Sequence, residues 1–187
     1  MTLQKFSVIK QSDWKVSNWS GGTTSELYIS PANASFKLGN YDLRLSIATI
    51  EDEESVFTPL PGVFRTLTVL SGILELEHKN HHSAILKPYE QDSFLGDWTT
   101  RSHGKVKDFN VMTKGTAKFN VECIQSSSCT LSIPVNGILF IAEGSIKIGE
   151  EIYTENTLII SDSKVDILCL IEKSTRTLLI SRENIQS

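Results

Sequence analysis

The stretch Leu67-Thr68-Val69-Leu70-Ser71-Gly72-Ile73-Leu74-Glu75-Leu76 decides the fold, because the chain contains it twice in recognisable form. The second copy is Leu139-Phe140-Ile141-Ala142-Glu143-Gly144-Ser145-Ile146-Lys147-Ile148. In each copy an apolar run is followed by a glycine and then by an alternating run, which is the pattern of two strands joined by a tight bend. One supersecondary unit that occurs twice predicts two related β-domains in one chain.

The rest of the chain also consists of short alternating runs separated by Gly, Pro, Asn or Asp, without long helical periodicity. In Tyr41 to Ala48, for example, Leu43, Leu45 and Ile47 fall on one face of a strand and polar residues on the other. The sequence therefore predicts an all-β fold of two barrels or sandwiches, at residues 1–115 and 116–187. The second half is plainer in its chemistry, so we expect the function in the first.

Composition narrows the class of protein. The 187 residues include 18 basic and 22 acidic ones, the net charge is −4, and no basic cluster stands out, which disfavours nucleic acid or an anionic membrane as a partner. The three cysteines, Cys123, Cys129 and Cys169, form no C-x-x-C pair, so neither a disulfide framework nor a thiolate zinc site is indicated. Without an apolar leader or a long apolar run, we expect a soluble, cytoplasmic protein.

The run Trp19-Ser20-Gly21-Gly22-Thr23-Thr24-Ser25-Glu26 carries unusual chemistry. Two adjacent glycines can adopt positive φ and expose backbone N–H groups, and three hydroxyls and a carboxylate follow them. This pattern is typical of a binding loop. The alternative is a Gly-Gly turn that leads into the strand Leu27-Tyr28-Ile29, with the hydroxyl residues chosen for turn and strand propensity.

The pattern around Gly72 is similar to the middle of a cupin motif, and metal-binding cupins place a glutamate seven residues before this glycine. Here that position is Arg65, and the positions of the usual two histidines fall in Thr58-Pro59-Leu60-Pro61, which has no ligand. Cationic Arg65 would repel a divalent metal. We therefore expect no metal and no cofactor in the first barrel.

The histidines and the nucleophilic residues give no other site. His78, His81 and His82 surround Lys79 and Asn80 on an expected hairpin tip, where solvated polar residues are usual, and we predict a solvated tip there in preference to a zinc site. His103 lies in another polar stretch. The sequence has no G-x-S-x-G elbow and no cysteine in an activating context, so no catalytic residue is predicted.

Polar residues do recur at odd places on the expected strands. Arg65 shares a strand face with Leu67 and Val69. By the same alternation Arg44 shares a face with Ser46, and Asp108 shares a face with Asn110. The plain alternatives are a wet sheet face for Arg44 and an internal salt bridge from Arg65 to Asp108 or Glu26.

If these groups converge, two guanidinium groups, hydroxyls and an amide suit a small carboxylate or a similar anion. Phe57, Phe64 and Trp98 are candidates for the apolar walls of the pocket. The predicted ligand-binding residues are Gly21, Gly22, Thr23, Glu26, Arg44, Ser46, Phe57, Arg65, Asp108 and Asn110.

Several blocks of the first half resemble the HutD/Ves family. Trp19 to Leu27 resembles the family's W-x-[NS]-G-G-x-T-x-E-like opening, and four further blocks follow in the family's order over about residues 14–115. They are Leu43 to Ala48, Phe57 with Leu60 to Arg65, Phe94 to Asp97, and Asp108 to Met112. The resemblance implies a cytoplasmic bacterial bicupin, with two RmlC-like jelly-roll (double-stranded β-helix) barrels and without established enzymatic activity.

The same resemblance implies a function. Some family members accompany histidine-degradation genes and have been suggested to bind or respond to a metabolite such as formylglutamate or urocanate, whereas Ves-like members are described as stress-related. We therefore expect a metal-independent protein that binds a small anionic metabolite. The alternatives are an isomerase or hydrolase of such a metabolite, with Glu26 or Asp108 as the general base, and a protein-interaction module. Jelly-roll proteins often form homodimers, but no stretch of this sequence identifies the face involved.

Overall fold

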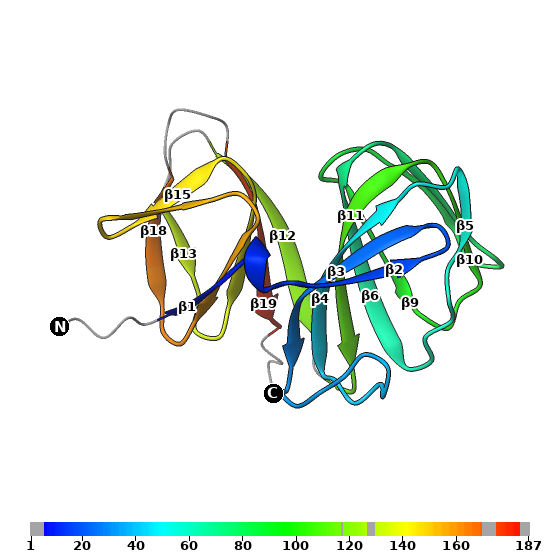
Figure 1. The fold of residues 1–187 in the computed structure, drawn as a ribbon, viewed down its shortest axis with the longest axis horizontal. Helices are drawn as coiled ribbons and strands as arrows, with labels where there is room; N and C mark the ends of the chain where they lie inside the picture. Colours follow the sequence, from blue (N-terminus) through cyan, green and yellow to red (C-terminus); the bar gives the residue numbers. More distant parts are fainter. Residues whose placement is uncertain (1–5, 117, 127–129, 170–174, 184–187) are drawn as a thin grey trace. The chain divides into compact units, whose positions relative to one another are not determined.

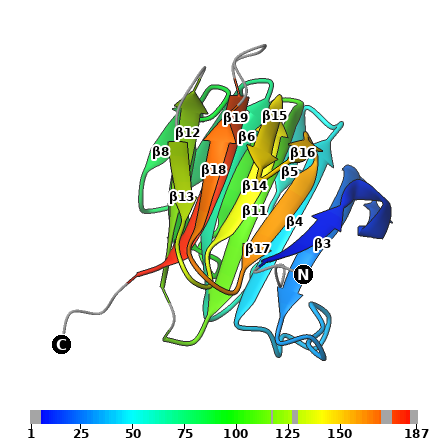
Figure 2. The same cartoon turned by 90° about the vertical axis from the view of Figure 1, so that its left-hand side faces the viewer.

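The computed structural model describes residues 6–116, 118–126, 130–169 and 175–183. These residues form nineteen β-strands and one short 3₁₀ helix, Gln11–Asp13, and no α-helix occurs among them. The strand pairs among these residues are antiparallel. Figure 1 shows two barrel-like units, and Figure 2 shows the same strands turned by 90°. The all-β fold predicted from the alternating runs is confirmed.

The first unit comprises Trp14–Ala117 and contains two sheets that face each other. The six-stranded sheet has the order β2 (Lys15–Trp19), β3 (Gly22–Ser30), β4 (Leu43–Ile50), β11 (Val106–Lys114), β6 (Val63–Ser71), β9 (Gln91–Leu95). The four-stranded sheet has the order β5 (Glu54–Val56), β10 (Thr100–His103), β7 (Leu74–His78), β8 (Ser83–Leu86).

A compact apolar core fills one part of this unit. Its members come from both sheets and are at most about one-twentieth exposed: Ile50, Leu67, Val69, Leu74, Leu76, Leu86, Phe94 and Val106. Since they alternate along their strands with outward-facing residues, the period-2 pattern of the sequence is what brings them together. Another part of the interior combines polar side chains with a smaller apolar cluster around Tyr41, Val63 and Met112, and it holds the site described below.

The second unit combines Met1–Asp13 with Lys118–Ser187. One sheet has the order β1 (Phe6–Lys10), β17 (Thr157–Ser161), β14 (Ile138–Glu143), β19 (Thr175–Arg182), β12 (Phe119–Ser126). The other has the order β13 (Thr130–Ile133), β18 (Val165–Cys169), β15 (Ser145–Ile148), β16 (Glu151–Thr154). Its core is almost entirely aliphatic and includes Leu139, Ile141 and Leu179.

The repeated stretch forms the same pair of strands in both units. β6 and β7 are joined at Gly72, and β14 and β15 at Gly144, with φ of 89° and 78°. A Cβ on Gly72 would lie 2.5 Å from the carbonyl oxygen of Lys105, so both the positive φ and the close approach of a neighbouring strand require glycine there. β6 lies between β11 and β9, as β14 lies between β19 and β17, so the two barrels share one topology.

The chain crosses between the units near its start. β1 pairs with β17 from Phe6↔Ser161 to Lys10↔Thr157, so residues 6–13 complete the second barrel, whereas the sequence analysis placed them in a first domain of residues 1–115. An alternating strand fits either barrel, and its partner is more than a hundred residues away, so local sequence could not assign it. No helix among the described residues has the length and apolarity needed to cross a bilayer. Cys123 is a free thiol, while Cys129 lies outside the described residues.

Candidate functional site

A cavity of about 400 Å³ opens in the first barrel, at its polar end. It is lined by side chains from β2, β3, β4, β5, β6 and β11 and from the segments around Phe36 and Phe57: Ser17, Asn18, Trp19, Thr24, Phe36, Arg44, Ser46, Ala48, Ile50, Ser55, Val56, Phe57, Thr58, Leu60, Arg65, Asp108, Asn110 and Met112. Its volume lies in the range of small-molecule sites. Alternation on β4 and β11 aims every second side chain into it.

Arg44 is held by an anionic partner and an aromatic ring. Its Nε donates to Glu26 Oε2 at 2.8 Å and its Nη1 to Ser46 Oγ at 3.1 Å, while its Cζ lies 4.1 Å from the centre of the Phe36 ring. The Arg44 side chain is 6% exposed and the Glu26 side chain 18%. The Arg44 charge is therefore compensated within the protein, and its guanidinium is fixed in one orientation.

Arg65 is buried with less compensation. Its Nη2 donates to Asn110 Oδ1 at 2.6 Å, but its Nε has no hydrogen-bond partner among the described residues. The guanidinium also lies over two rings, with Cζ 4.7 Å from the centre of Phe57 and 5.1 Å from that of Phe94. Burial lowers the pKa of Arg65 to about 10, which leaves it cationic at neutral pH. The cavity thus contains a desolvated guanidinium, and its Nε–H is available to a ligand.

Asp108 is the carboxyl group next to this cation. It is 1% exposed, and Asn110 donates its Nδ2–H to Asp108 Oδ1. Burial raises the pKa of Asp108 to about 7, although the Arg65 charge and the Asn110 hydrogen bond both act in the opposite direction. The net charge of the cavity therefore changes with protonation of Asp108 near neutral pH.

The comparisons with known proteins settle the family. The HutD family profile matches residues 9–184. This chain belongs to the HutD family. No curated protein sequence gives a significant match.

Three solved structures share the fold of this HutD-family chain at low sequence identity. PA5104 from Pseudomonas aeruginosa PAO1, described as a conserved protein of unknown function, is 17% identical with a TM-score of 0.80, over 97% of this chain and 100% of its own. HutD from Pseudomonas fluorescens SBW25 is 21% identical with a TM-score of 0.74, over 96% and 100%. Vicilin from hazelnut (Corylus avellana), 8% identical, matches with a TM-score of 0.64 over 96% and 88%. The predicted bicupin fold is thereby confirmed.

The HutD-family barrel brings together most of the predicted ligand-binding residues. Those that line the cavity are Arg44, Ser46, Phe57, Arg65, Asp108 and Asn110. Glu26 contacts the site through its salt bridge with Arg44, whereas the sequence analysis considered it as a partner of Arg65. Arg65 takes Asn110 as its hydrogen-bond partner, while Asp108 acts on it electrostatically.

Gly21, Gly22 and Thr23 do not line the cavity. Trp19 pairs with Gly22, so the two glycines belong to the hairpin between β2 and β3, and the strand that follows already begins at Gly22. A Cβ on Gly22 would lie 1.9 Å from the carbonyl oxygen of Thr49, which is why glycine stands there. In this respect the turn interpretation of the loop describes the structure better than a backbone cradle does.

The sequence analysis missed several residues that line the cavity, among them Trp19, Thr24 and Phe36. Thr24 is one residue from predicted Thr23 and lies on the opposite face of the strand, so the strand register would have identified it. Phe36 lies between strands, where no periodicity points to it. Of the other proposed walls, Phe64 is 41% exposed and Trp98 packs against histidines instead.

The expectation of a solvated histidine tip is wrong for His78. This residue ends β7, is 2% exposed, and packs with its ring centre 4.4 Å from that of Phe94. His81 stacks on Trp98 at 3.6 Å, and the His82 side chain is 42% exposed. His78 pairs with Thr100 of β10, and this pairing places its side chain inside the barrel. The polar neighbours of His78 in the sequence do not indicate that position.

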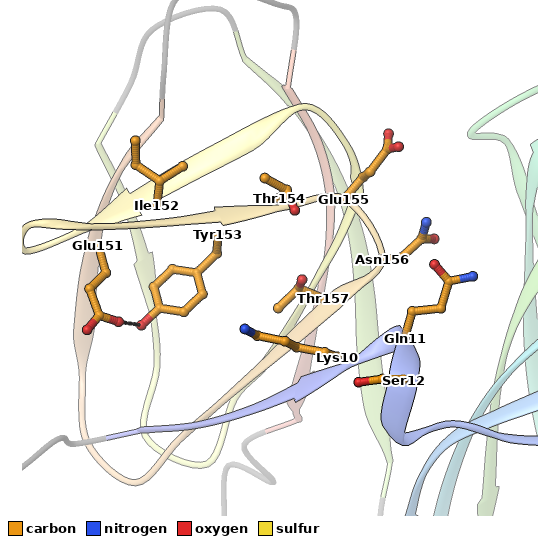
Figure 3. Close-up of a pocket in the computed structure, with 10 residues that line it drawn as sticks. All are labelled: Lys10, Gln11, Ser12, Glu151, Ile152, Tyr153, Thr154, Glu155, Asn156 and Thr157. Carbon is orange, nitrogen blue, oxygen red and sulfur yellow. Dashed lines mark hydrogen bonds between the residues drawn. The ribbon is translucent and has the colours of Figure 1, made fainter.

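A second hollow, of about 480 Å³, lies on the other unit (Figure 3). Tyr153 donates to Glu151 Oε2 at 2.5 Å within it, and Ile152 points away from Tyr153 because strand β16 alternates. Its other lining residues include Lys10 and Asn156, and the charged groups that the described part of the chain contributes to it are on exposed side chains. With its polar groups spread out and solvated, it is a weaker candidate for a ligand site than the cavity of the first barrel.

The cavity of the first barrel does not fit a metal of the cupin type. Among the residues that the structure describes, its lining includes one carboxyl group, Asp108, and neither histidine nor cysteine. The cationic Arg65 guanidinium is buried beside that carboxyl. This set of groups suits an anion, since a divalent cation would be repelled by Arg65 and would find too few ligands.

Proposed function

We propose that the first barrel binds a small anionic metabolite with at least one carboxylate, in a metal-independent manner. The observation that carries the proposal is Arg65, a buried guanidinium that lines a cavity of suitable size and whose Nε has no hydrogen-bond partner among the residues that the structure describes. A buried donor left unpaired costs about 1–3 kcal/mol, and a carboxylate in the cavity would remove that cost. Planar guanidinium groups bind carboxylates in a two-point geometry.

The groups around Arg65 indicate how the ligand would be oriented in the cavity. Arg65 would accept the carboxylate, the rings of Phe57 and Phe36 would cover the apolar part, and Asp108 would meet an N–H or a second polar group of the ligand. Formylglutamate and urocanate both carry a carboxylate together with N–H groups. Together with HutD-family membership, this favours a role as a binding or regulatory protein in histidine utilisation.

A thermal-shift screen tests this proposal. Formylglutamate, glutamate, urocanate and related carboxylates are added to the purified chain, and a bound ligand raises the melting temperature by mass action. The Arg65→Met variant keeps the length and apolar packing of the side chain but removes its charge, and it should lose the shift. Arg101→Met is the matched control, because Arg101 is exposed on β10 and outside the cavity.

Two results would count against the proposal. The first is the absence of a shift with every carboxylate tested, and the second is an equal shift in Arg65→Met and the wild-type chain. Isothermal titration with the ligand that gives the largest shift then measures stoichiometry, which should be one per chain because one cavity is involved.

A specific observation favours a second candidate, an isomerase or hydrolase of the same class of metabolite. General acid–base catalysis is most effective when the pKa of the catalytic group is near the working pH, and burial raises the pKa of Asp108 to about 7. NMR of each bound carboxylate over time distinguishes the two functions. Turnover that is abolished in Asp108→Asn supports the enzyme, and an unchanged ligand spectrum supports the binding protein.

A further inference from the structure

Two histidines and an aspartate of the first barrel converge on one point outside the cavity. His78 Nε2 lies 2.9 Å from Asp92 Oδ2, and His82 Nε2 lies 3.0 Å from both Asp92 oxygens. None of the three residues lines the cavity that contains Arg65. Among the residues that the structure describes, this is the one group of three or more His, Cys, Asp or Glu side chains close enough to share a metal ion.

The cluster joins the two sheets of the barrel. His78 ends β7 and His82 lies in the hairpin after it, both at the four-stranded sheet, whereas Asp92 lies on β9 of the six-stranded sheet. The side chain of His78 is fully buried and that of Asp92 is 14% exposed, while that of His82 is 42% exposed. The cluster is thus rigid on its inner side and open to solvent on the side of His82.

The two ring nitrogens of His78 contact different side chains. Thr100 Oγ1 lies 2.8 Å from His78 Nδ1 and 3.4 Å from the carbonyl oxygen of Trp98. In the tautomer with the proton on Nδ1, His78 donates to Thr100 and Thr100 donates to Trp98. The Nε2 lone pair of that tautomer faces Asp92 Oδ2 at 2.9 Å and is available to a metal ion.

A metal ion placed between His78 Nε2 and the Asp92 carboxylate would accept lone pairs from both groups. It would also be within reach of His82 Nε2, which lies 3.0 Å from the same carboxylate. The Nδ1–H to Thr100 contact is then the usual outer hydrogen bond that orients a metal-binding histidine.

We propose that His78, His82 and Asp92 bind one divalent transition-metal ion of the zinc class. Two imidazole nitrogens and a carboxylate oxygen are ligands that zinc prefers, and a site of three protein ligands leaves a fourth position to water. Zinc–ligand bonds of about 2.0–2.1 Å in a tetrahedron place ligand atoms about 3.3 Å apart. The ligand atoms here all lie within 4.8 Å of one another, and the half-exposed His82 is free to close the difference.

Bound there, the ion links the edge strand β9 to the end of β7. Among the described residues β9 pairs with β6 alone. The metal–ligand bonds would therefore add a second attachment for this edge strand. The site is independent of the proposed anion pocket and does not rest on it, because the two share no ligand residue.

Isothermal titration of the full-length, chelator-treated chain with Zn²⁺ tests the site. We expect one ion per chain at micromolar concentrations, with a rise in melting temperature, and Co²⁺ should give the intense visible absorption of four-coordinate cobalt. His82→Ala and Asp92→Asn should each weaken binding at least about tenfold, and Thr100→Val about tenfold through the lost orienting hydrogen bond. His82 is the safest variant for folding because its side chain is half-exposed.

His103→Ala is the matched control, because it removes an exposed histidine on the same sheet that is outside the cluster. It should bind Zn²⁺ as the wild-type chain does. The proposal is overturned by the absence of stoichiometric binding, by equal weakening in His103→Ala and His82→Ala, or by unchanged affinity in Thr100→Val. Far-ultraviolet circular dichroism of each variant establishes that the barrel is folded before its affinity is compared.

Discussion

Replacing Asp108 with asparagine should change how the stability of the first barrel depends on pH. Burial raises the pKa of Asp108 from 3.8 to about 7 in the folded protein. Because the pKa is higher in the folded state, the folded protein binds the Asp108 proton more tightly, and this stabilisation is fully present below the unfolded pKa and lost as pH rises through the folded pKa. Between the two pKa values the free energy of unfolding falls by up to about 1.4 kcal/mol per pH unit, which gives an upper limit of about 4 kcal/mol in total.

Asparagine keeps the shape of Asp108 and cannot titrate, so the variant should gain stability relative to the wild-type chain as pH rises from about 4 to about 7. Urea unfolding followed by tryptophan fluorescence measures this, because Trp14, Trp19 and Trp98 are the only tryptophans and all lie in the first unit. Asp97→Asn, at an exposed position, is the control and should alter stability by less than about 0.5 kcal/mol. A stability difference between Asp108→Asn and wild type that stays constant with pH would refute the reasoning.

Three further substitutions, one of them with a glycine control, test the first barrel by the same unfolding assay. Glu26→Gln removes the anionic partner of buried Arg44 and should cost about 1–3 kcal/mol, with glutamine retaining only a neutral hydrogen bond. Gly72→Ala should cost at least about 1–3 kcal/mol because of its positive φ and a contact at 2.5 Å, whereas Gly115→Ala, with nothing within 4 Å, should cost about 1 kcal/mol. Phe94→Ala, at a position 2% exposed, should cost about 3–5 kcal/mol, and a smaller loss would indicate that the core collapses around it.

Period-2 alternation was enough to predict the strands and the faces of the polar residues. Arg44 and Ser46 on β4, and Asp108 and Asn110 on β11, enter one cavity because every second residue of a strand points the same way. The glycine repeat likewise predicted two barrels of one topology, since Gly72 occupies a bend that no other residue fits. These features depend on local stereochemistry, which a sequence records directly.

Features that depend on long-range pairing could not be predicted in the same way. β1 pairs with β17, and His78 meets Asp92 only because the two sheets of a barrel face each other. The Thr23 prediction shows the limit on a finer scale, since a shift of one residue separates it from Thr24, which lines the cavity. Register within a sheet, and the contact between sheets, depend on the whole fold rather than on any one stretch.

The second barrel provides an internal control for the function of the first. Leu67 pairs with Asn110 between β6 and β11, and at the same place in the repeat Leu139 pairs with Leu179 between β14 and β19. The fold therefore forms with an aliphatic pair at this place in the second barrel. The first barrel has there the buried amide of Asn110, which accepts a hydrogen bond from Arg65.

A buried arginine and a buried carboxyl group each cost several kcal/mol in desolvation, and replacing such groups with apolar residues is often stabilising. Among the described residues of the second barrel, the buried polar side chains are hydroxyl groups only, and Thr177 stands opposite Ile141 where Asp108 stands opposite Val69. The second barrel therefore folds without a buried charged pair. The buried charges of the first barrel are thus not required by the architecture, and the cost of burying them supports the anion site proposed above.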